Sequence, residues 1–269
     1  MKKILFLIII SILTSCEEVV DVDLNTAPPR LVIEASIDWI KGTAGNEQTI
    51  KLITTSEYYN TTSPVVSGAT VFVTNSTGDV FDFIEAPDSG EYVCSNFVPV
   101  LNETYTLNIE NNGEFYTATE KLISAPNIED NIEQKNDGGF SQDEIEIKFF
   151  YQDDGSVDNY YLESFESDIT PFPEYSAASD ELFQGNQMFG LFSNEDTAVG
   201  DNIAIKLYGI SNRYYEYMTK LLEAADSGGL FGTISSTIRG NIINQTNSSN
   251  YALGYFRLSE VDTKSYVVQ

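Results

Sequence analysis

Thr104-Tyr105-Thr106-Leu107-Asn108-Ile109-Glu110, at residues 104–110, alternates polar and apolar side chains without a break. Successive side chains of a β-strand point to opposite faces, so this stretch predicts a strand with one buried face and one solvated face. Similar runs rich in β-branched and aromatic residues surround it, with Asn-, Gly- and Pro-rich turns between them. This regular spacing favours antiparallel β-structure. The other strands expected in this half of the chain are residues 31–37, 49–54, 69–74, 80–84, 91–97 and 114–122.

The order of the segments 67–73, 90–92 and 105–107 resembles the small immunoglobulin-like or regulatory modules that are common in bacterial surface proteins. Such modules mostly present or space other parts of a protein. The polar stretch 129–140 contains Gly138-Gly139, and polar Gly-containing stretches are typical of junctions. We therefore expect a mainly β chain, with an immunoglobulin-like sandwich over residues 30–126 and a second β-rich domain over residues 127–269.

The second half of the chain shows strand patterns less regularly. Ile145, Ile147 and Phe149 alternate with polar residues ahead of a turn at 153–155, which predicts a hairpin with residues 160–165. Residues 202–208 alternate as well. No clean period is visible over residues 171–192, which we expect to be loop or irregular. Further strands are expected within residues 234–243, 251–256 and 265–268.

One helix is expected, over residues 211–226. Apolar side chains recur there at steps of three and four residues, which places them on one face of a helix. Ser211 is suited to cap the first turn, and Gly228-Gly229 is suited to end the helix. Core packing is the preferred interpretation of the Tyr-, Met- and Leu-rich face, and a ligand groove is the alternative.

The N-terminus has the features of an export signal. Lys2 and Lys3 precede an apolar run over residues 4–13, which is shorter than the roughly 20 residues of a membrane-spanning helix. Leu13-Thr14-Ser15-Cys16 resembles a bacterial lipobox, which implies removal of the signal peptide 1–15 and a lipid anchor on Cys16. Two or three acyl chains hold a protein far more firmly than one. The alternative is an ordinary secretory signal with an incidental cysteine.

Residues 16–29 are acidic and then Pro-rich, which predicts an extended, solvated tether. Acidic residues directly after a lipidated cysteine resemble the surface-export signal of Bacteroidota lipoproteins. That resemblance implies the outer face of the outer membrane. A tether without export meaning is the alternative, and it would leave the chain on the periplasmic leaflet.

Charge excludes one class of partner. Loss of Lys2 and Lys3 with the signal leaves 12 of the 14 basic residues against 41 acidic ones. Nucleic-acid binding requires clustered Lys and Arg, and no such run occurs. Apolar residues make up 42% of the chain, enough to build a core. Cys94 is the thiol that remains beside Cys16, so we expect no internal disulfide and a buried structural role for Cys94.

The sequence contains no recognisable set of catalytic residues. The chain has no His, which removes the usual Ser-His-Asp and Cys-His systems and the His ligands of most catalytic zinc sites. No Gly-rich phosphate loop precedes a helix, and we expect no cofactor. A carboxylate-based hydrolase stays open, because glycoside hydrolysis needs two acids about 5–9.5 Å apart and 41 acids are present.

Two shorter patterns concern ligands and modification. Asp153, Asp154 and Asp158 lie in a Gly-containing turn and offer oxygens to Ca²⁺, but their spacing differs from that of a calcium loop. A solvated turn is the preferred interpretation. Asp196-Thr197-Ala198 resembles the O-glycosylation site of exported Bacteroidota proteins.

The lipobox, the segment Leu31-Val32-Ile33-Glu34-Ala35, the motif Arg239-Gly240-Asn241-Ile242 and the motif Leu253-Gly254-Tyr255-Phe256 together resemble domain-of-unknown-function family 4249 of Bacteroidota lipoproteins. The resemblance covers nearly the whole mature chain. It implies an accessory lipoprotein of an outer-membrane TonB-dependent receptor, and no catalytic residues are carried over.

The leading hypothesis is thus a lipid-anchored binding or accessory subunit, with membrane attachment through Cys16 and a TonB-dependent receptor as partner. The alternative is a free-standing surface adhesin or glycan-binding lipoprotein, which would expose coplanar aromatic side chains such as Trp39. A carboxylate hydrolase is the third hypothesis. A glycan or a peptide is the expected kind of ligand, and its identity and the oligomeric state stay open.

Overall fold

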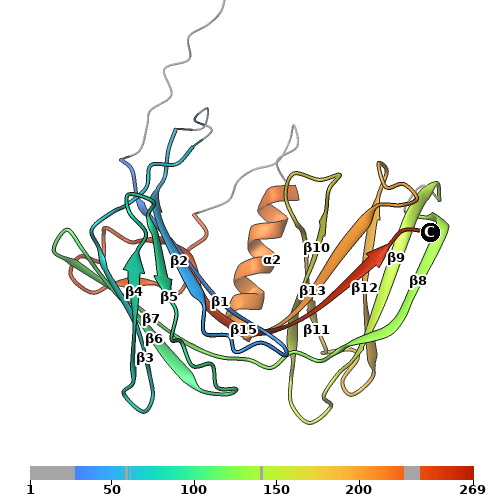
Figure 1. The fold of residues 1–269 in the computed structure, drawn as a ribbon, viewed down its shortest axis with the longest axis horizontal. Helices are drawn as coiled ribbons and strands as arrows, with labels where there is room; N and C mark the ends of the chain where they lie inside the picture. Colours follow the sequence, from blue (N-terminus) through green and yellow to red (C-terminus); the bar gives the residue numbers. More distant parts are fainter. Residues whose placement is uncertain (1–27, 58–59, 61, 140–141, 227–236) are drawn as a thin grey trace, which may run out of the picture.

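The computed structural model describes residues 28–57, 60, 62–139, 142–226 and 237–269. Cys16 and most of the predicted tether therefore lie outside the described residues. The described part is mostly β, with one helix, as expected (Figure 1). Its elements are β1 (Leu31–Ile40), β2 (Gln48–Thr54), β3 (Thr70–Asn75), β4 (Val80–Glu85), β5 (Glu91–Cys94), β6 (Thr104–Asn111), β7 (Glu114–Lys121), β8 (Ile128–Gly138), β9 (Glu144–Gln152), β10 (Tyr160–Ser167), β11 (Glu174–Ser179), β12 (Gln187–Asn194), β13 (Asn202–Ile210), α2 (Asn212–Asp226), β14 (Ile243–Asn244) and β15 (Leu253–Val267).

The strands form two lobes. A 12-stranded sheet has the order β11-β10-β13-β15-β1-β2-β5-β4-β3-β6-β7-β14, and a three-stranded sheet has the order β12-β9-β8. Figure 1 shows β1 to β7 in one lobe, β8 to β13 in the other, and β15 running from the first lobe into the second. Helix α2 lies between the lobes. The 12-stranded sheet continues from one lobe into the other, so the two lobes share a backbone hydrogen-bond network.

Strand β15 joins the lobes. Its residues Leu253–Val261 pair in parallel with β1, and its residues Val261–Val267 pair antiparallel with β13. The predicted strands 251–256 and 265–268 are thus parts of one 15-residue strand. The predicted domain boundary at residue 126 falls between β7 and β8, but the chain later returns to the first lobe through β14 and the first half of β15.

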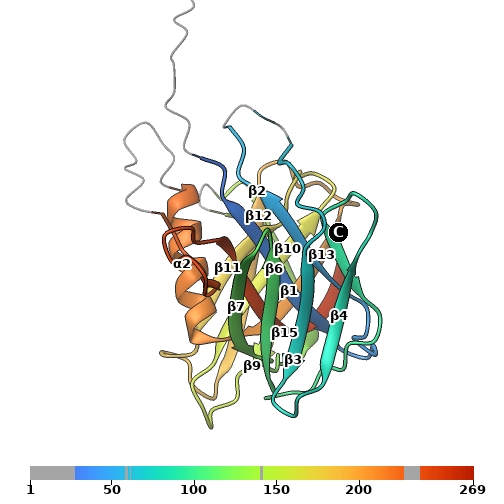
Figure 2. The same cartoon turned by 90° about the vertical axis from the view of Figure 1, so that its left-hand side faces the viewer.

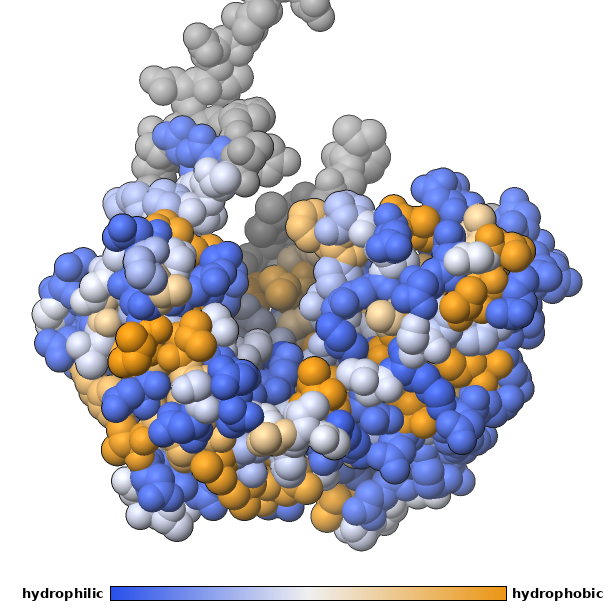
Figure 3. Space-filling view, viewed as in Figure 1, coloured by the Kyte–Doolittle hydropathy of each residue, from blue (hydrophilic) through white to orange (hydrophobic). Residues whose placement is uncertain are grey.

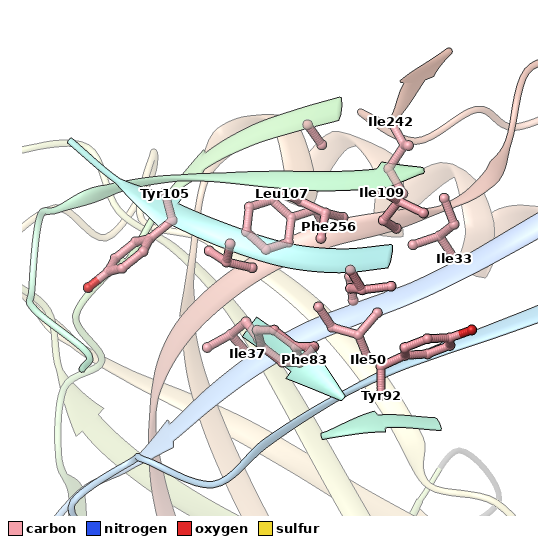
Figure 4. Close-up of a cluster of buried hydrophobic side chains, with 14 of the residues drawn as sticks. Ile33, Ile37, Ile50, Phe83, Tyr92, Tyr105, Leu107, Ile109, Ile242 and Phe256 are labelled. Carbon is pink, nitrogen blue, oxygen red and sulfur yellow. The ribbon is translucent and has the colours of Figure 1, made fainter. Parts of the chain in front are cut away.

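The first lobe is a sandwich around one core. The large sheet curls so that β3, β6 and β7 pack against β1, β2 and β5 (Figure 2). Tyr105, Leu107 and Ile109 of β6 are fully buried, as their alternation predicts, and they belong to one core cluster with Ile33, Ile37 and Phe256 (Figure 4). The thiol of Cys94 is buried in the same core, and burial raises its pKa.

The second lobe is a sandwich with a different pairing from the one expected. The predicted hairpin of residues 145–149 with 160–165 is wrong, because β9 pairs with β8 and β12 whereas β10 pairs with β11 and β13. The turn at 153–155 carries the chain from one sheet to the facing one. The Tyr151 and Tyr161 rings then meet across the core, with centroids 5.0 Å apart. Alternation correctly indicates the buried faces but does not specify partners.

The expectation of irregular structure over residues 171–192 is also wrong, since β11 and β12 lie there. Strand β11 is a partly exposed edge strand without a regular burial pattern. In β12, Met188, Gly190 and Phe192 face inward, and Gly190 interrupts the apolar period. A Cβ at Gly190 would lie 2.2 Å from the Phe149 ring, so the packing requires glycine at this position. The same glycine breaks the alternation of apolar residues by which the strand would have been predicted.

Helix α2 matches its prediction to within one residue. The Ser211 hydroxyl accepts a hydrogen bond from the Tyr214 amide at 3.3 Å and caps the first turn. Tyr214 and Met218 are buried in a third core cluster, against Tyr208 and Val261 of the sheet. Core packing is thus the role of this part of the helix face, and it holds α2 in place beside β15.

Candidate ligand pocket beside helix α2

Three sequence motifs separated along the chain meet beside α2. Gly254 has φ +92°, and a Cβ on it would lie 2.0 Å from the carbonyl oxygen of Ile33. A Cβ on Gly240 would lie 1.8 Å from the carbonyl oxygen of Gly254. The segments 31–35, 239–242 and 253–256 therefore stack with no space for side chains at these two glycines.

Asn241 attaches the middle segment to β15. Its side-chain amide donates to the Phe256 carbonyl at 2.8 Å, and its side-chain oxygen accepts from the Phe256 amide at 2.9 Å. Asn241 is buried, so both of these bonds are shielded from water. The pair acts like two rungs of a β-ladder and fixes the backbone of Arg239 and Gly240 opposite the helix.

A pocket of about 410 Å³ lies between α2 and this segment. The helix supplies one wall with residues on its outer face, and residues 237–240 supply the other. Tyr255 of β15 forms part of the lining. Figure 3 shows that the surface is hollowed between the two lobes and that hydrophilic residues and hydrophobic patches are mixed on both. The lining residues are Arg213, Glu216, Tyr217, Lys220, Thr237, Ile238, Arg239, Gly240 and Tyr255.

Positive charge gathers at this pocket. Arg213, Lys220 and Arg239 line it, and Glu216 is the one carboxylate in its lining. Arg30 flanks the same place, because the Arg30 and Arg239 guanidinium carbons lie 3.9 Å and 3.7 Å from the centroid of the Tyr251 ring. Hydrogen bonding to Thr237 and the nearby charges of these two arginines lower the pKa of Tyr251.

The inner part of the pocket is aromatic. The Tyr255 ring lies 4.9 Å from the Tyr217 ring and 4.8 Å from the Tyr214 ring, centroid to centroid. The Tyr255 hydroxyl donates to the buried carboxylate of Glu120 at 3.1 Å. Burial raises the pKa of Tyr255, and the Glu120 charge acts in the same direction. Tyr255 therefore stays a neutral phenol, held against the helix by its contacts with Tyr214 and Tyr217.

An ion pair that sequence reasoning missed supports the pocket from below. The Arg257 guanidinium lies 2.7 Å from the Asp38 carboxylate and packs near the rings of Tyr208 and Tyr214. Burial alone would lower the pKa of Arg257, but Asp38, Tyr214 and Tyr208 together outweigh burial and keep the pKa above its ordinary value. The signal in the sequence was a basic residue placed between the apolar residues Phe256 and Leu258.

The acidic turn that offered a calcium alternative has protein partners. Asp153 is buried and accepts hydrogen bonds from the Tyr161 hydroxyl at 2.6 Å and the Gly185 amide at 2.7 Å. Asp154 accepts from the amide and hydroxyl of Ser156. Among the residues that the structure describes, no three His, Cys, Asp or Glu side chains come together in a way that could hold a metal ion.

The structure also describes the surroundings of two other predicted features, the O-glycosylation site and Trp39. Thr197 is buried with its hydroxyl shielded from solvent, which opposes glycosylation of the folded chain at Asp196-Thr197-Ala198. The Trp39 indole donates to the Thr43 carbonyl at 3.0 Å and packs on the turn at Gly45. Trp39 is therefore anchored to its own turn. No helix in the described parts of the chain is long and apolar enough to cross a membrane.

A second, smaller hollow of about 160 Å³ lies in the second lobe. It is lined by Phe183, Phe189, Met188, Ala178 and Ser179, none of which carries a charge. Neither pocket contains two carboxylates, so neither supplies the acid pair that glycoside hydrolysis requires.

The fold and the pocket define a mostly β protein of two sandwich lobes, with one helix bordering a cation-lined pocket. The chain belongs to the family described as Domain of unknown function (DUF4249), whose model matches residues 17–265. A comparison with curated proteins gives no match.

Solved structures that this chain resembles include fibronectin type III proteins. One is a two-domain fibronectin type III segment of chicken tenascin, at 11% identity and TM-score 0.22, over 67% of this chain and 90% of that one. Another is the FN1–FN3 segment of chicken CNTN1, at 13% identity and TM-score 0.25, over 68% and 60%. A third is a DUF4785 family protein from Legionella pneumophila, at 11% identity and TM-score 0.25, over 69% and 53%.

Proposed function

We propose that this chain is a lipid-anchored binding protein of the bacterial outer membrane, and that it works as an accessory subunit beside a TonB-dependent receptor. The N-terminal sequence through Cys16 supports the anchor, and the acidic residues behind it support a position on the cell surface of a Bacteroidota cell. The partner is inferred from the resemblance to accessory lipoproteins of TonB-dependent receptors that was drawn from the sequence motifs.

The observation that carries a binding role is the pocket beside α2. Its walls come from α2, from residues 237–240 and from Tyr255, so two of the motifs that carry the resemblance, 239–242 and 253–256, contribute to it. It combines charged and hydroxyl groups with tyrosine rings, which is the composition of sites that orient a ligand. It contains a single carboxylate, Glu216, and no His, so recognition fits its chemistry better than hydrolysis does.

Affinity purification tests the receptor partnership. A tagged full-length chain is purified from detergent-solubilised outer membranes, and a TonB-dependent barrel is expected to co-elute. Mass spectrometry of the N-terminus is expected to find Cys16 acylated, and Cys16→Ser is expected to leave the membrane fraction. Recovery of the acylated chain without any barrel would contradict the receptor role.

A second candidate is a free-standing glycan-binding lipoprotein. The Tyr217 and Tyr255 rings favour it, because they border the pocket and offer apolar surfaces to a sugar ring. This candidate predicts glycan binding by the purified chain with no barrel in the complex. Co-elution of a barrel at a fixed ratio would favour the first candidate instead.

A further inference from the structure

We infer that the pocket beside α2 binds an acidic sugar, with the carboxylate or sulfate group of the sugar held by Arg213, Lys220 and Arg239. This inference rests on the proposed binding role of the pocket and not on the receptor, so it stands whether or not a barrel co-purifies. It names the chemical class of the ligand.

The charge distribution carries the first step. The chain has 41 acidic and 14 basic residues and a formal net charge of −27, so its overall field repels anions. Arg30, Arg213, Lys220 and Arg239 nevertheless gather at one place. Within residues 28–57, 60, 62–139, 142–226 and 237–269, none of these four cations forms an ion pair with a carboxylate. Like charges brought together without carboxylate partners repel one another, and an anionic ligand reduces that repulsion.

The geometry carries the second step. Arg213 and Lys220 are seven residues apart on α2, about two helical turns, so both project from one face of the helix. Arg239 projects from the opposite wall, where its guanidinium stacks 3.7 Å from the centroid of the Tyr251 ring. Stacking restricts the Arg239 side chain before any ligand arrives, and a guanidinium fork matches the two oxygens of a carboxylate.

The remaining lining favours a sugar over a simple anion. Glu216 and Thr237 offer oxygens that can accept hydrogen bonds from sugar hydroxyls. Tyr217 and Tyr255 provide ring surface for the apolar face of a sugar. The volume of about 410 Å³ is within the range of small-molecule sites, about 300–1,000 Å³. A bare phosphate or sulfate would leave most of these groups unused.

The test is a binding experiment with the purified full-length chain in detergent. A panel of uronic-acid, sialic-acid and sulfated oligosaccharides is compared with neutral sugars of the same length. Inorganic sulfate and a polyglutamate peptide are included as further probes. The best binder is then titrated by calorimetry against the chain and its variants.

We expect an acidic sugar to bind at least tenfold more tightly than its neutral counterpart. Arg239→Ala is expected to weaken that binding at least tenfold, and Arg239→Lys to weaken it less. Lys121→Ala removes an exposed cation from β7 and is expected to leave affinity unchanged. Thermal unfolding of each variant shows that it is folded.

Four results would overturn the inference. They are no binding of any acidic sugar, equal binding of acidic and neutral sugars, binding of sulfate or polyglutamate as tight as that of every acidic sugar, and an equal loss of affinity in Lys121→Ala and Arg239→Ala. The last result would mean that general electrostatics, and not the pocket, attracts the ligand.

Discussion

The Arg257 guanidinium forms an ion pair with the Asp38 carboxylate at 2.7 Å, and this pair connects β15 to β1 beneath helix α2. Asp38→Asn would leave a buried cation without its countercharge. We expect it to lower the free energy of unfolding by about 3 kcal/mol, the low end for a broken buried pair, because the Asp38 side chain is 36% exposed.

Denaturant unfolding at constant pH checks this value. The control is Lys135→Ala, which breaks an exposed pair with Glu146 and is expected to cost about 0.5 kcal/mol. An equal loss in free energy of unfolding in the two variants would mean that the Arg257–Asp38 ion pair does not stabilise the pairing of β15 with β1.

Gly254 and Gly78 have nearly the same backbone φ, +92° and +90°, but different surroundings. A Cβ on Gly78 meets nothing within 4 Å, so Gly78→Ala is expected to cost only the strain of a positive φ, about 1–2 kcal/mol. Gly254→Ala also forces the Cβ against the Ile33 carbonyl, and we expect a loss above about 4 kcal/mol or failure to fold. Unfolding midpoints of the two variants measure the difference. Similar midpoints would contradict the requirement for close contact between Gly254 of β15 and Ile33 of β1.

Burial raises the pKa of Glu163 from 4.5 to about 7, although the hydrogen bond donated by Tyr151 lowers it in part. A carboxyl whose pKa is raised on folding favours the folded state while it is protonated. Its contribution is complete below pH 4.5 and is lost as pH rises through about 7.

Glu163→Gln keeps a neutral side chain at every pH. We expect its stability relative to the parent chain to rise by about 3 kcal/mol at most between pH 4.5 and pH 7.5. Unfolding free energies of both chains across that interval give the difference. A difference that does not change with pH would show that Glu163 does not titrate in this range.

Leu107 and Thr106 are neighbours on β6 that face opposite sides of the sheet. Leu107 is fully buried, so Leu107→Ala is expected to cost about 2–5 kcal/mol through lost burial and a cavity. Thr106 faces outward, where its hydroxyl meets that of Thr119, and Thr106→Ala is expected to change stability by about 0.5 kcal/mol or less. Urea unfolding separates the two cases, and comparable losses would contradict the assignment of the faces.

Local patterns predicted local features well. The alternation at 104–110 correctly gave the buried side of β6, and the three- and four-residue steps after Ser211 gave the helix and its cap. The pocket was not predicted as a site, although Arg239, Gly240 and Tyr255 belong to motifs that the resemblance had singled out. Arg213 and Lys220 gave no signal, because charged residues on the outer face of a helix are ordinary.

By itself, therefore, the sequence determined which side chains turn inward on the regularly alternating strands such as β6, where the helix lies, and the acidic balance of the chain. The first two depend on neighbours within a few residues, and the third is a property of composition. Only the tertiary structure decided that β9 and β10 face each other across a core, that β15 pairs with strands of both lobes, and that three cations line one pocket with a fourth, Arg30, beside it. Strand partners and pocket walls come from residues as far apart as Ile33 and Gly254. Periodicity contains no information about which distant segment a given face will meet.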